Sequence, residues 1–149
     1  MTPSVFLLLN LALGFYLVGA IWAHEIDIFR SWVALDPDTL HRVQSRHWRK
    51  LPYWVFLPLA LAFAGSVALL WYHPAGSPSW ALWGNLACQG VSHLLTAFMW
   101  GPWQARLSTD PAGGRSRYLA RIVRTHWIRT LLINGYGLIL LAWAIVVAR

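Results

Sequence analysis

The feature of this sequence that most constrains its fold is a set of four apolar runs, each long enough to cross a lipid bilayer. A transmembrane helix needs roughly 20 mostly apolar residues, and such runs cover residues 3–23, 51–72, 79–103 and 125–148. Only 11% of the 149 residues are charged, whereas soluble domains carry about 25%. The sequence therefore predicts one all-α domain, an integral membrane four-helix antiparallel bundle.

Lysine and arginine predict how these helices cross the membrane. Five of the twelve lie in the stretch 24–50 and five more in 104–124. Positive residues favour the cytoplasmic side, so both stretches are predicted to be cytoplasmic loops of the cell inner (plasma) membrane, with both termini outside. The eleven tryptophans gather toward the ends of the apolar runs, as expected at lipid headgroups. Because the basic residues flank apolar runs, the formal charge of +7 does not indicate nucleic-acid binding.

Short local signals predict the connections between the helices. Asp36 or Asp38 is expected to cap an interfacial helix within residues 25–47. Pro58 is expected to bend the second transmembrane helix. Proline and glycine within residues 74–78 predict a short turn, so helices two and three should pack as a hairpin.

Ionisable side chains crowd the predicted cytoplasmic ends of all four helices. Such groups are costly inside a membrane and by default suggest function. The polar residues at this level are His24, Glu25, Asp27, Arg46, His47, Arg49, Gln104, Arg106, His126 and Arg129. We expect a charge network that includes His24, in which Glu25 balances Arg129 or Asp27 balances Arg49.

A second polar set lies deeper in the predicted bundle. Its members share one face of the third run or one stripe of the fourth: Gln89, Ser92, His93, Thr96 and Trp100, and His126, Thr130, Asn134 and Gly137. His93 lies roughly 15 Å from the end of its run, at 1.5 Å per residue. These side chains indicate either interhelical hydrogen bonds or ligand contacts. Gly14 and Gly137 permit either close packing or a small pocket beside His93.

The histidines leave a metal site open as an alternative. His24, His47 and His126 share one level with Glu25 and could supply nitrogen and oxygen ligands. No two of them stand at a diagnostic spacing on one helix, and His93 has no second histidine at its depth to ligate a haem. The sequence therefore assigns no metal and leaves the cofactor unknown.

Three segments resemble a known group of proteins: LHRVQSRHWRKLPYWVFLP, QGVSHLLTAFMWGPWQARL and LARIVRTHWIRTLLINGYGLILL. From about Gly14 to Leu141, the chain is similar to small four-helix bacterial membrane proteins related to the anthrone oxygenase-like family. Relatives often carry asparagine in place of His126, and the better matching positions are His47, Gln89, His93 and Arg129. The resemblance implies oxidation of a polycyclic phenolic substrate by oxygen, without a dedicated cofactor.

Two functions remain open from the sequence. In the first, an oxygenase-like enzyme acts on a lipophilic aromatic small molecule, with His93 or His126 as general base and Arg129 stabilising negative charge. Its substrate contacts are expected from His47, Trp54, Gln89, Trp100 and Asn134. In the alternative, the chain is a non-catalytic accessory subunit or a ligand- or pigment-binding protein. The implied partners are membrane lipid, a lipophilic small molecule, and a larger membrane complex or homo-oligomer.

Overall fold

The computed structural model describes residues 1–149, and it is 84% helical with no strands. This confirms the predicted all-α class. The helical segments join end to end into four continuous rods, and loops connect one rod to the next. They are, in chain order, α1 (Pro3–Ala23), η1 (His24–Ile28) and α2 (Phe29–Trp32); α3 (Pro37–Leu51), η2 (Pro52–Phe56) and α4 (Leu57–Ala68); α5 (Ser79–Leu95), η3 (Thr96–Trp100) and α6 (Gly101–Leu107); and, after the short η4 (Gly113–Arg115), α7 (Arg117–Val147).

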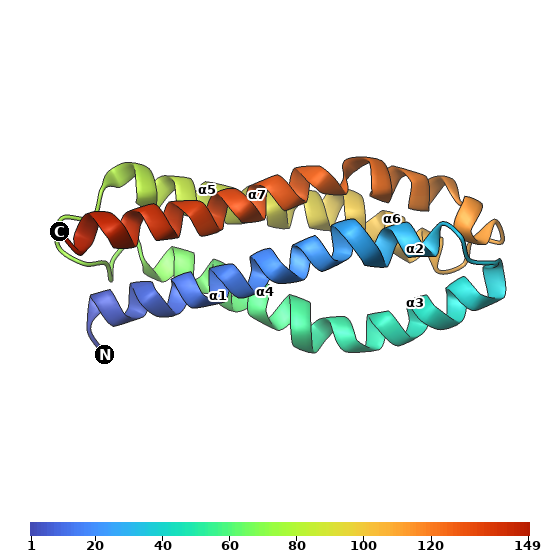
Figure 1. The fold of residues 1–149 in the computed structure, drawn as a ribbon, viewed down its shortest axis with the longest axis horizontal. Helices are drawn as coiled ribbons and strands as arrows, with labels where there is room; N and C mark the ends of the chain where they lie inside the picture. The colour runs from blue at the N-terminus through green and yellow to red at the C-terminus, as the bar shows by residue number, and fades with distance from the viewer.

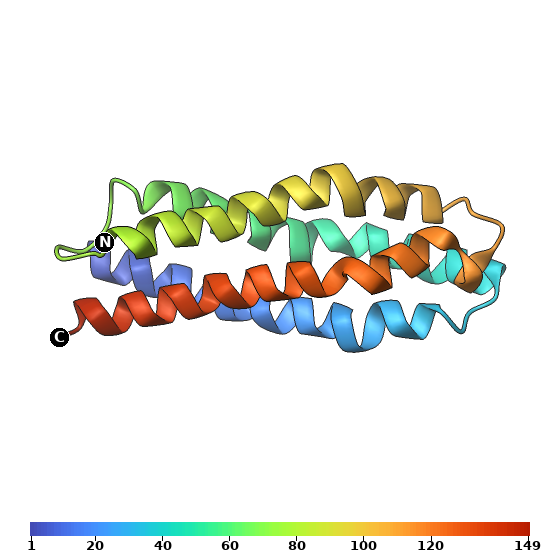
Figure 2. The same cartoon turned by 90° about the horizontal axis from the view of Figure 1, so that it is seen from above.

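The four rods lie side by side and alternate in direction (Figures 1 and 2). Both termini and the connection 69–78 lie at one end, here called the terminal end. The connections 33–36 and 108–116 lie at the opposite end, here called the loop end. The fourth rod packs along both the first and the third, and α4 contacts α1 and α5.

The apolar core fills the half of the bundle nearer the terminal end. Its largest members are Trp143 and Tyr136 of α7, packed with leucines from α1 and α4. A Cβ atom on Gly137 would lie 3.1 Å from Val18, and one on Gly14 would lie 3.2 Å from Tyr136. The two glycines therefore serve close packing of α1 against α7, and they leave no pocket at that depth.

The loop end has a small core of its own, built from Phe29, Trp32, Leu40, Leu107, Leu119 and Ile122. Two glycines bring the connecting loops together above it. Gly113 adopts φ 55°, and Gly114 donates its N–H to the carbonyl of Leu35 at 3.1 Å. A Cβ atom on Gly114 would lie 2.5 Å from the Val33 carbonyl oxygen, so only glycine fits there.

Three of the rods are long and apolar enough to cross a membrane: Pro3–Trp32, Pro37–Ala68 and Arg117–Val147. They contain the predicted span 3–23, all but the last residue of the span 125–148, and most of the span 51–72. The third rod is not among these three, because the polar side chains of Asn85, Gln89, Ser92 and His93 lower its hydropathy. Asn85, Gln89 and Ser92 are buried inside the bundle, whereas His93 is partly exposed.

The rods extend further toward the loop end than the apolar runs predicted. The first helix continues through η1 to Trp32, and the fourth begins at Arg117. The expected interfacial helix is not a separate element, because α3 runs directly into η2 and α4. Its predicted cap is confirmed, since the Asp36 carboxylate accepts the Thr39 N–H at 3.0 Å. Hydropathy alone missed these extensions because polar residues dominate them.

Candidate functional site

Three of the four rods contain one π-helical turn, and all three turns border the same region of the bundle. In each turn an N–H donates to the carbonyl five residues earlier: Phe29 to His24, Leu57 to Pro52, and Gly101 to Thr96. Single π-helical turns are rare, and they occur frequently at functional sites. The region between η1, η2 and η3 is therefore the candidate site.

Two of the π-helical turns have a visible cause in the sequence. Pro58 has no N–H to donate to the carbonyl of Trp54, as an α-helix would require. The Tyr16 hydroxyl on the first rod donates to that carbonyl instead, at 2.7 Å. Pro102 stands at the same position relative to η3 as Pro58 does to η2. The structure thus has a π-helical turn where the sequence predicted a bend at Pro58. The turn η1 has no proline at the corresponding position, so the sequence does not predict it.

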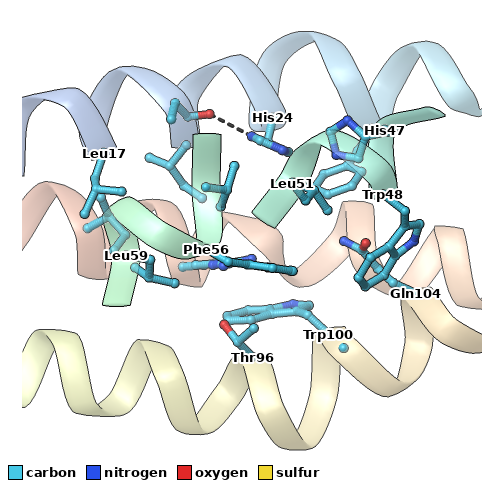
Figure 3. A pocket seen from close by; sticks show the side chains of 17 residues that line it. Leu17, His24, His47, Trp48, Leu51, Phe56, Leu59, Thr96, Trp100 and Gln104 are labelled. Atoms are coloured by element: carbon cyan, nitrogen blue, oxygen red, sulfur yellow. Dashed lines mark hydrogen bonds between the residues drawn. The ribbon is translucent and has the colours of Figure 1, made fainter. Parts of the chain in front are cut away.

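A cavity of about 50 Å³ lies between the π-helical turns (Figure 3). Most of its wall is apolar, including Leu17, Ile21 and Leu59. Phe56 of η2 and Trp100 of η3 lie on opposite sides of it (Figure 3). Its polar lining comes from His24, His47, Thr96, Gln104 and Arg129. The cavity therefore offers a few polar groups within an apolar and aromatic shell, which is the usual make-up of a small-molecule site.

The second rod stands off from its neighbours beside this cavity. The backbone of α3 approaches mainly the adjoining η2 and η4 at the loop end, and the Gln44 side chain of α3 bridges to the third rod by donating to the Gln104 carbonyl at 3.0 Å. Trp48 and Phe56 of the second rod and Thr96 and Gln104 of the third bound the cavity on this side. The side between the second and third rods is therefore closed by side chains and not by close helix packing.

His24 is held in one orientation at the edge of the cavity. Its Nδ1 lies 2.8 Å from the carbonyl oxygen of Ala20 (Figure 3). A carbonyl oxygen can only accept, so Nδ1 carries the hydrogen and Nε2 carries the lone pair. Trp54 stacks on the ring at 5.1 Å between centroids, and the His47 ring lies 5.3 Å away. His24 thus presents a fixed basic nitrogen.

Glu25 follows His24 in η1 and is only 8% exposed. Its carboxylate accepts from Arg30 at 2.9 Å and from Nδ1 of His126 at 3.0 Å. The sequence predicted Arg129 as its partner, and the structure corrects this. The turn η1 brings Arg30, five residues further on, over Glu25, and its Nε also donates to the Glu25 carbonyl at 2.9 Å. The residues of the other expected pair, Asp27 and Arg49, are exposed and form no ion pair.

Arg129 is buried, with 7% exposure, and lacks an acidic partner. Glu25 is occupied by the ion pair with Arg30 and by the hydrogen bond from His126. The guanidinium carbon lies 5.5 Å from the centroid of the Trp100 ring, and Nε has no hydrogen-bond acceptor. Burying a charge without a partner costs several kcal/mol. Arg129 therefore places a positive charge without a counter-ion, at a cost in stability, on the wall of the cavity.

Other predicted site residues lie outside the cavity. His93 donates from Nδ1 to the Gln89 carbonyl at 2.8 Å, and its ring packs on Phe63 at 4.8 Å. Gln89 is fully buried and lines no part of the cavity. Asn134 accepts from Trp22 at 3.3 Å and donates to the Thr130 carbonyl at 2.7 Å. The structure thus separates these three from His47, Trp100 and Arg129, which it brings together.

His126 takes an intermediate position. It is buried beside Phe29, with ring centroids 4.8 Å apart, and its Nε2 has no hydrogen-bond partner. It contacts Glu25 but does not line the cavity. No group of three His, Cys, Asp or Glu side chains is placed to hold a metal ion. The structure therefore brings together the predicted level of His24, His47, His126 and Glu25: the His24 ring lies 5.3 Å from that of His47 and 6.3 Å from that of His126, and of the four residues only His126 and Glu25 are hydrogen-bonded to each other.

Sequence reasoning missed several cavity residues that carry no charge. In the sequence these residues are ordinary lipid-facing or core positions, and their spacing does not identify them as cavity residues: Leu17, Phe29, Phe56 and Leu59. In the sequence, Arg30 indicated only the orientation of the helices in the membrane. The available signal was indirect: Pro58 and Pro102 identify two helices whose carbonyls are not bonded in the regular way.

Comparisons with protein-family models, curated proteins and solved structures find no match to this chain. The resemblance to the anthrone oxygenase-like proteins stays a prediction. The site is therefore interpreted from its own geometry: an apolar cavity between π-helical turns, an oriented histidine and an uncompensated arginine.

Proposed function

We propose that the chain crosses the cell inner membrane four times, with the loop end in the cytoplasm. Ten of the twelve lysines and arginines precede or follow the apolar runs on that side, which supports this orientation. The third rod is included because Asn85, Gln89 and Ser92 are buried, which keeps these three polar side chains out of contact with lipid. Rods of 30–32 residues are roughly 45 Å long, against roughly 30 Å of hydrocarbon. The cavity then lies near the inner boundary of the hydrocarbon.

We propose further that this cavity binds a lipophilic aromatic small molecule and that the protein is an oxygenase-like enzyme. The observation that carries the proposal is the convergence of three π-helical turns on one cavity that combines an aromatic and apolar wall with His24 and Arg129. The level at the membrane boundary gives a lipophilic substrate access from the bilayer. Phe56 and Trp100 on opposite walls suit a planar ring between them.

The proposed reaction begins with proton transfer. Nε2 of His24 takes a proton from an activated CH2 group of the substrate, and Arg129 stabilises the charge delocalised onto a neighbouring oxygen. Dioxygen, the co-substrate, accepts electrons from this carbanion and bonds to the carbon. The peroxide takes the proton back from His24, and loss of water leaves a ketone. The balance is CH2 plus O2 giving C=O plus H2O, and His24 ends as it began.

The test is oxygen consumption by the purified protein in nanodiscs, with a panel of lipophilic phenols that carry an activated CH2. The product should gain one oxygen atom and lose two hydrogens by mass spectrometry. Removing a general base lowers the rate by about 100-fold or more, so His24→Gln should lose turnover. His93→Gln is the matched control, because His93 lies outside the cavity and its replacement should leave the rate unchanged.

The outcomes separate the two functional classes. Equal losses in the two variants would show that the cavity is not where the reaction occurs. A lipophilic molecule that co-purifies and resists turnover under every condition would instead identify a non-catalytic ligand- or pigment-binding protein or accessory subunit. Retained activity in His24→Gln would remove His24 from the mechanism.

A further inference from the structure

No negatively charged group of the protein balances the positive charge of Arg129 on the cavity wall. The only buried carboxylate in the chain belongs to Glu25, and it is bonded to Arg30 and His126. The guanidinium carbon of Arg129 lies 5.5 Å from the centroid of the Trp100 ring, and this contact with the ring's π electrons supplies no hydrogen-bond acceptor. Nε has no acceptor within the protein. The donors of Arg129 are therefore available to a molecule in the cavity.

We infer that the cavity is an anion site and that its ligand is a lipophilic aromatic carboxylate, held by Arg129 and packed between Phe56 and Trp100. A guanidinium presents parallel N–H donors that match the two oxygens of a carboxylate. The apolar wall formed by Leu17 and Leu59 accommodates the body of the ligand. The ligand supplies the counter-charge that the fold lacks.

This inference rests on the proposed cavity and deepens the proposed function, because it names the ligand class of the same site. His24 and Arg129 line the cavity together. A carboxylate on Arg129 would therefore orient the ring with respect to Nε2 of His24. Binding is measurable without turnover, so the two proposals can fail separately.

The test compares naphthoate with its neutral analogue naphthylmethanol, using tryptophan fluorescence of the full chain in phosphatidylcholine nanodiscs. Naphthoate should bind roughly 10- to 100-fold more tightly than the alcohol, as expected for charge-assisted hydrogen bonds in a buried site. Arg129→Gln should abolish this preference and leave alcohol binding nearly unchanged. Arg124→Gln removes one exposed charge from the same helix and should keep the preference.

The same titrations in phosphatidylglycerol nanodiscs distinguish a free carboxylate from a lipid phosphodiester as the natural oxyanion. Unchanged naphthoate binding supports the free carboxylate, whereas competition by phosphatidylglycerol that disappears in Arg129→Gln overturns it in favour of lipid. Equal binding of acid and alcohol by the wild type, or equal losses in Arg124→Gln and Arg129→Gln, would overturn the anion site itself. His24→Gln should retain the preference for naphthoate even where oxygen consumption is lost. Arg129-dependent binding without any turnover would leave the anion site standing and remove the oxygenase.

Discussion

A buried arginine without a counter-ion lowers the stability of the fold that contains it. Arg129 loses its hydration on the wall of the cavity and recovers only a contact with Trp100. Replacing buried charges by apolar side chains of similar volume is often neutral or stabilising, by about 1–4 kcal/mol. Retaining arginine here is therefore explained more easily by a ligand than by folding.

We expect Arg129→Met to raise the thermal unfolding midpoint of the ligand-free protein by a few degrees, because methionine fills the space without the buried charge. Intrinsic tryptophan fluorescence during heating measures the midpoint. Arg124→Met, at an exposed position on the same helix, should shift it little. A midpoint that falls in Arg129→Met would mean that the guanidinium supports the fold directly.

The two partners of Glu25 should contribute very different free energies. The side chain of His126 is 1% exposed and that of Arg30 is 58% exposed. A double-mutant cycle on Glu25→Gln and His126→Asn should give a coupling free energy of about 1–3 kcal/mol, whereas the cycle with Arg30→Gln should give at most about 1 kcal/mol. Denaturant unfolding provides the four stabilities of each cycle. Equal couplings would argue that the cluster is more hydrated than its burial indicates.

At the scale of the helices, hydrophobic runs predicted the apolar parts of the four rods, and Pro58 predicted where one rod departs from regular α-helix. They could not predict η1, because its π-helical turn has no proline and arises only among packed neighbours. The pairing of Glu25 with Arg30 depends on that turn, so it was also beyond the sequence. Regular helical spacing therefore placed the first rod correctly and misplaced its charge network.

His93 shows the same limit at a single position of α5. Its neighbours Asn85, Gln89, Ser92 and Thr96 define the inward face at 100° per residue. His93 lies about 70° from the centre of that face, and it packs on Phe63 of α4. The helical periodicity was sufficient to identify the polar face. It does not decide whether a residue at the edge of that face points into the bundle or out of it, because this depends on the neighbouring helix.

The link between Tyr16 and Pro58 can be tested as a pair. Tyr16→Phe removes the donor to the Trp54 carbonyl and should destabilise the protein by about 0.5–1.5 kcal/mol, the net contribution of a typical hydrogen bond. Pro58→Ala restores a backbone N–H that can reach the same carbonyl. In the Pro58→Ala background, Tyr16→Phe should therefore cost much less. Additive effects in chemical unfolding would show that the hydroxyl and the proline act independently.

The loop between α6 and α7 should respond to acid through Asp110. The Ser116 hydroxyl donates to its Oδ2 at 2.6 Å and the Ala112 N–H to its Oδ1 at 3.0 Å, and these bonds lower the pKa of Asp110 below its ordinary value of 3.8. The stabilisation is therefore complete above that value and is lost as the pH falls through the lowered pKa. The protection factor of the Ala112 amide, which is its intrinsic exchange rate divided by the rate measured by NMR, should fall as the pH is lowered from about pH 6 to about pH 3. In Asp110→Asn this fall in protection should vanish, whereas Asp38→Asn should preserve it.

At the scale of the whole molecule, charge and length assign different roles to the two ends of the bundle. The terminal end is closed by an apolar core and a short connection, with few charged side chains. The loop end extends beyond the apolar runs, carries most of the basic residues and has its own small core. The cavity lies between these two regions. An orientation with the loop end in the cytoplasm would place the reactive groups within reach of both lipid and cytosolic water.

This orientation can be measured with single cysteines in a Cys88→Ala background. Ala75 is exposed at the terminal end and Ala112 is exposed at the loop end. A membrane-impermeant maleimide added to spheroplasts should label Ala75→Cys at once and Ala112→Cys only after permeabilisation, because basic loops are retained in the cytoplasm. The reverse pattern would invert the bundle, and equal labelling of both before permeabilisation would mean that it does not span the membrane. An inverted bundle would place the cavity at the outer boundary and deprive His24 of cytosolic access, so the oxygenase and the anion site would both need a substrate supplied from outside.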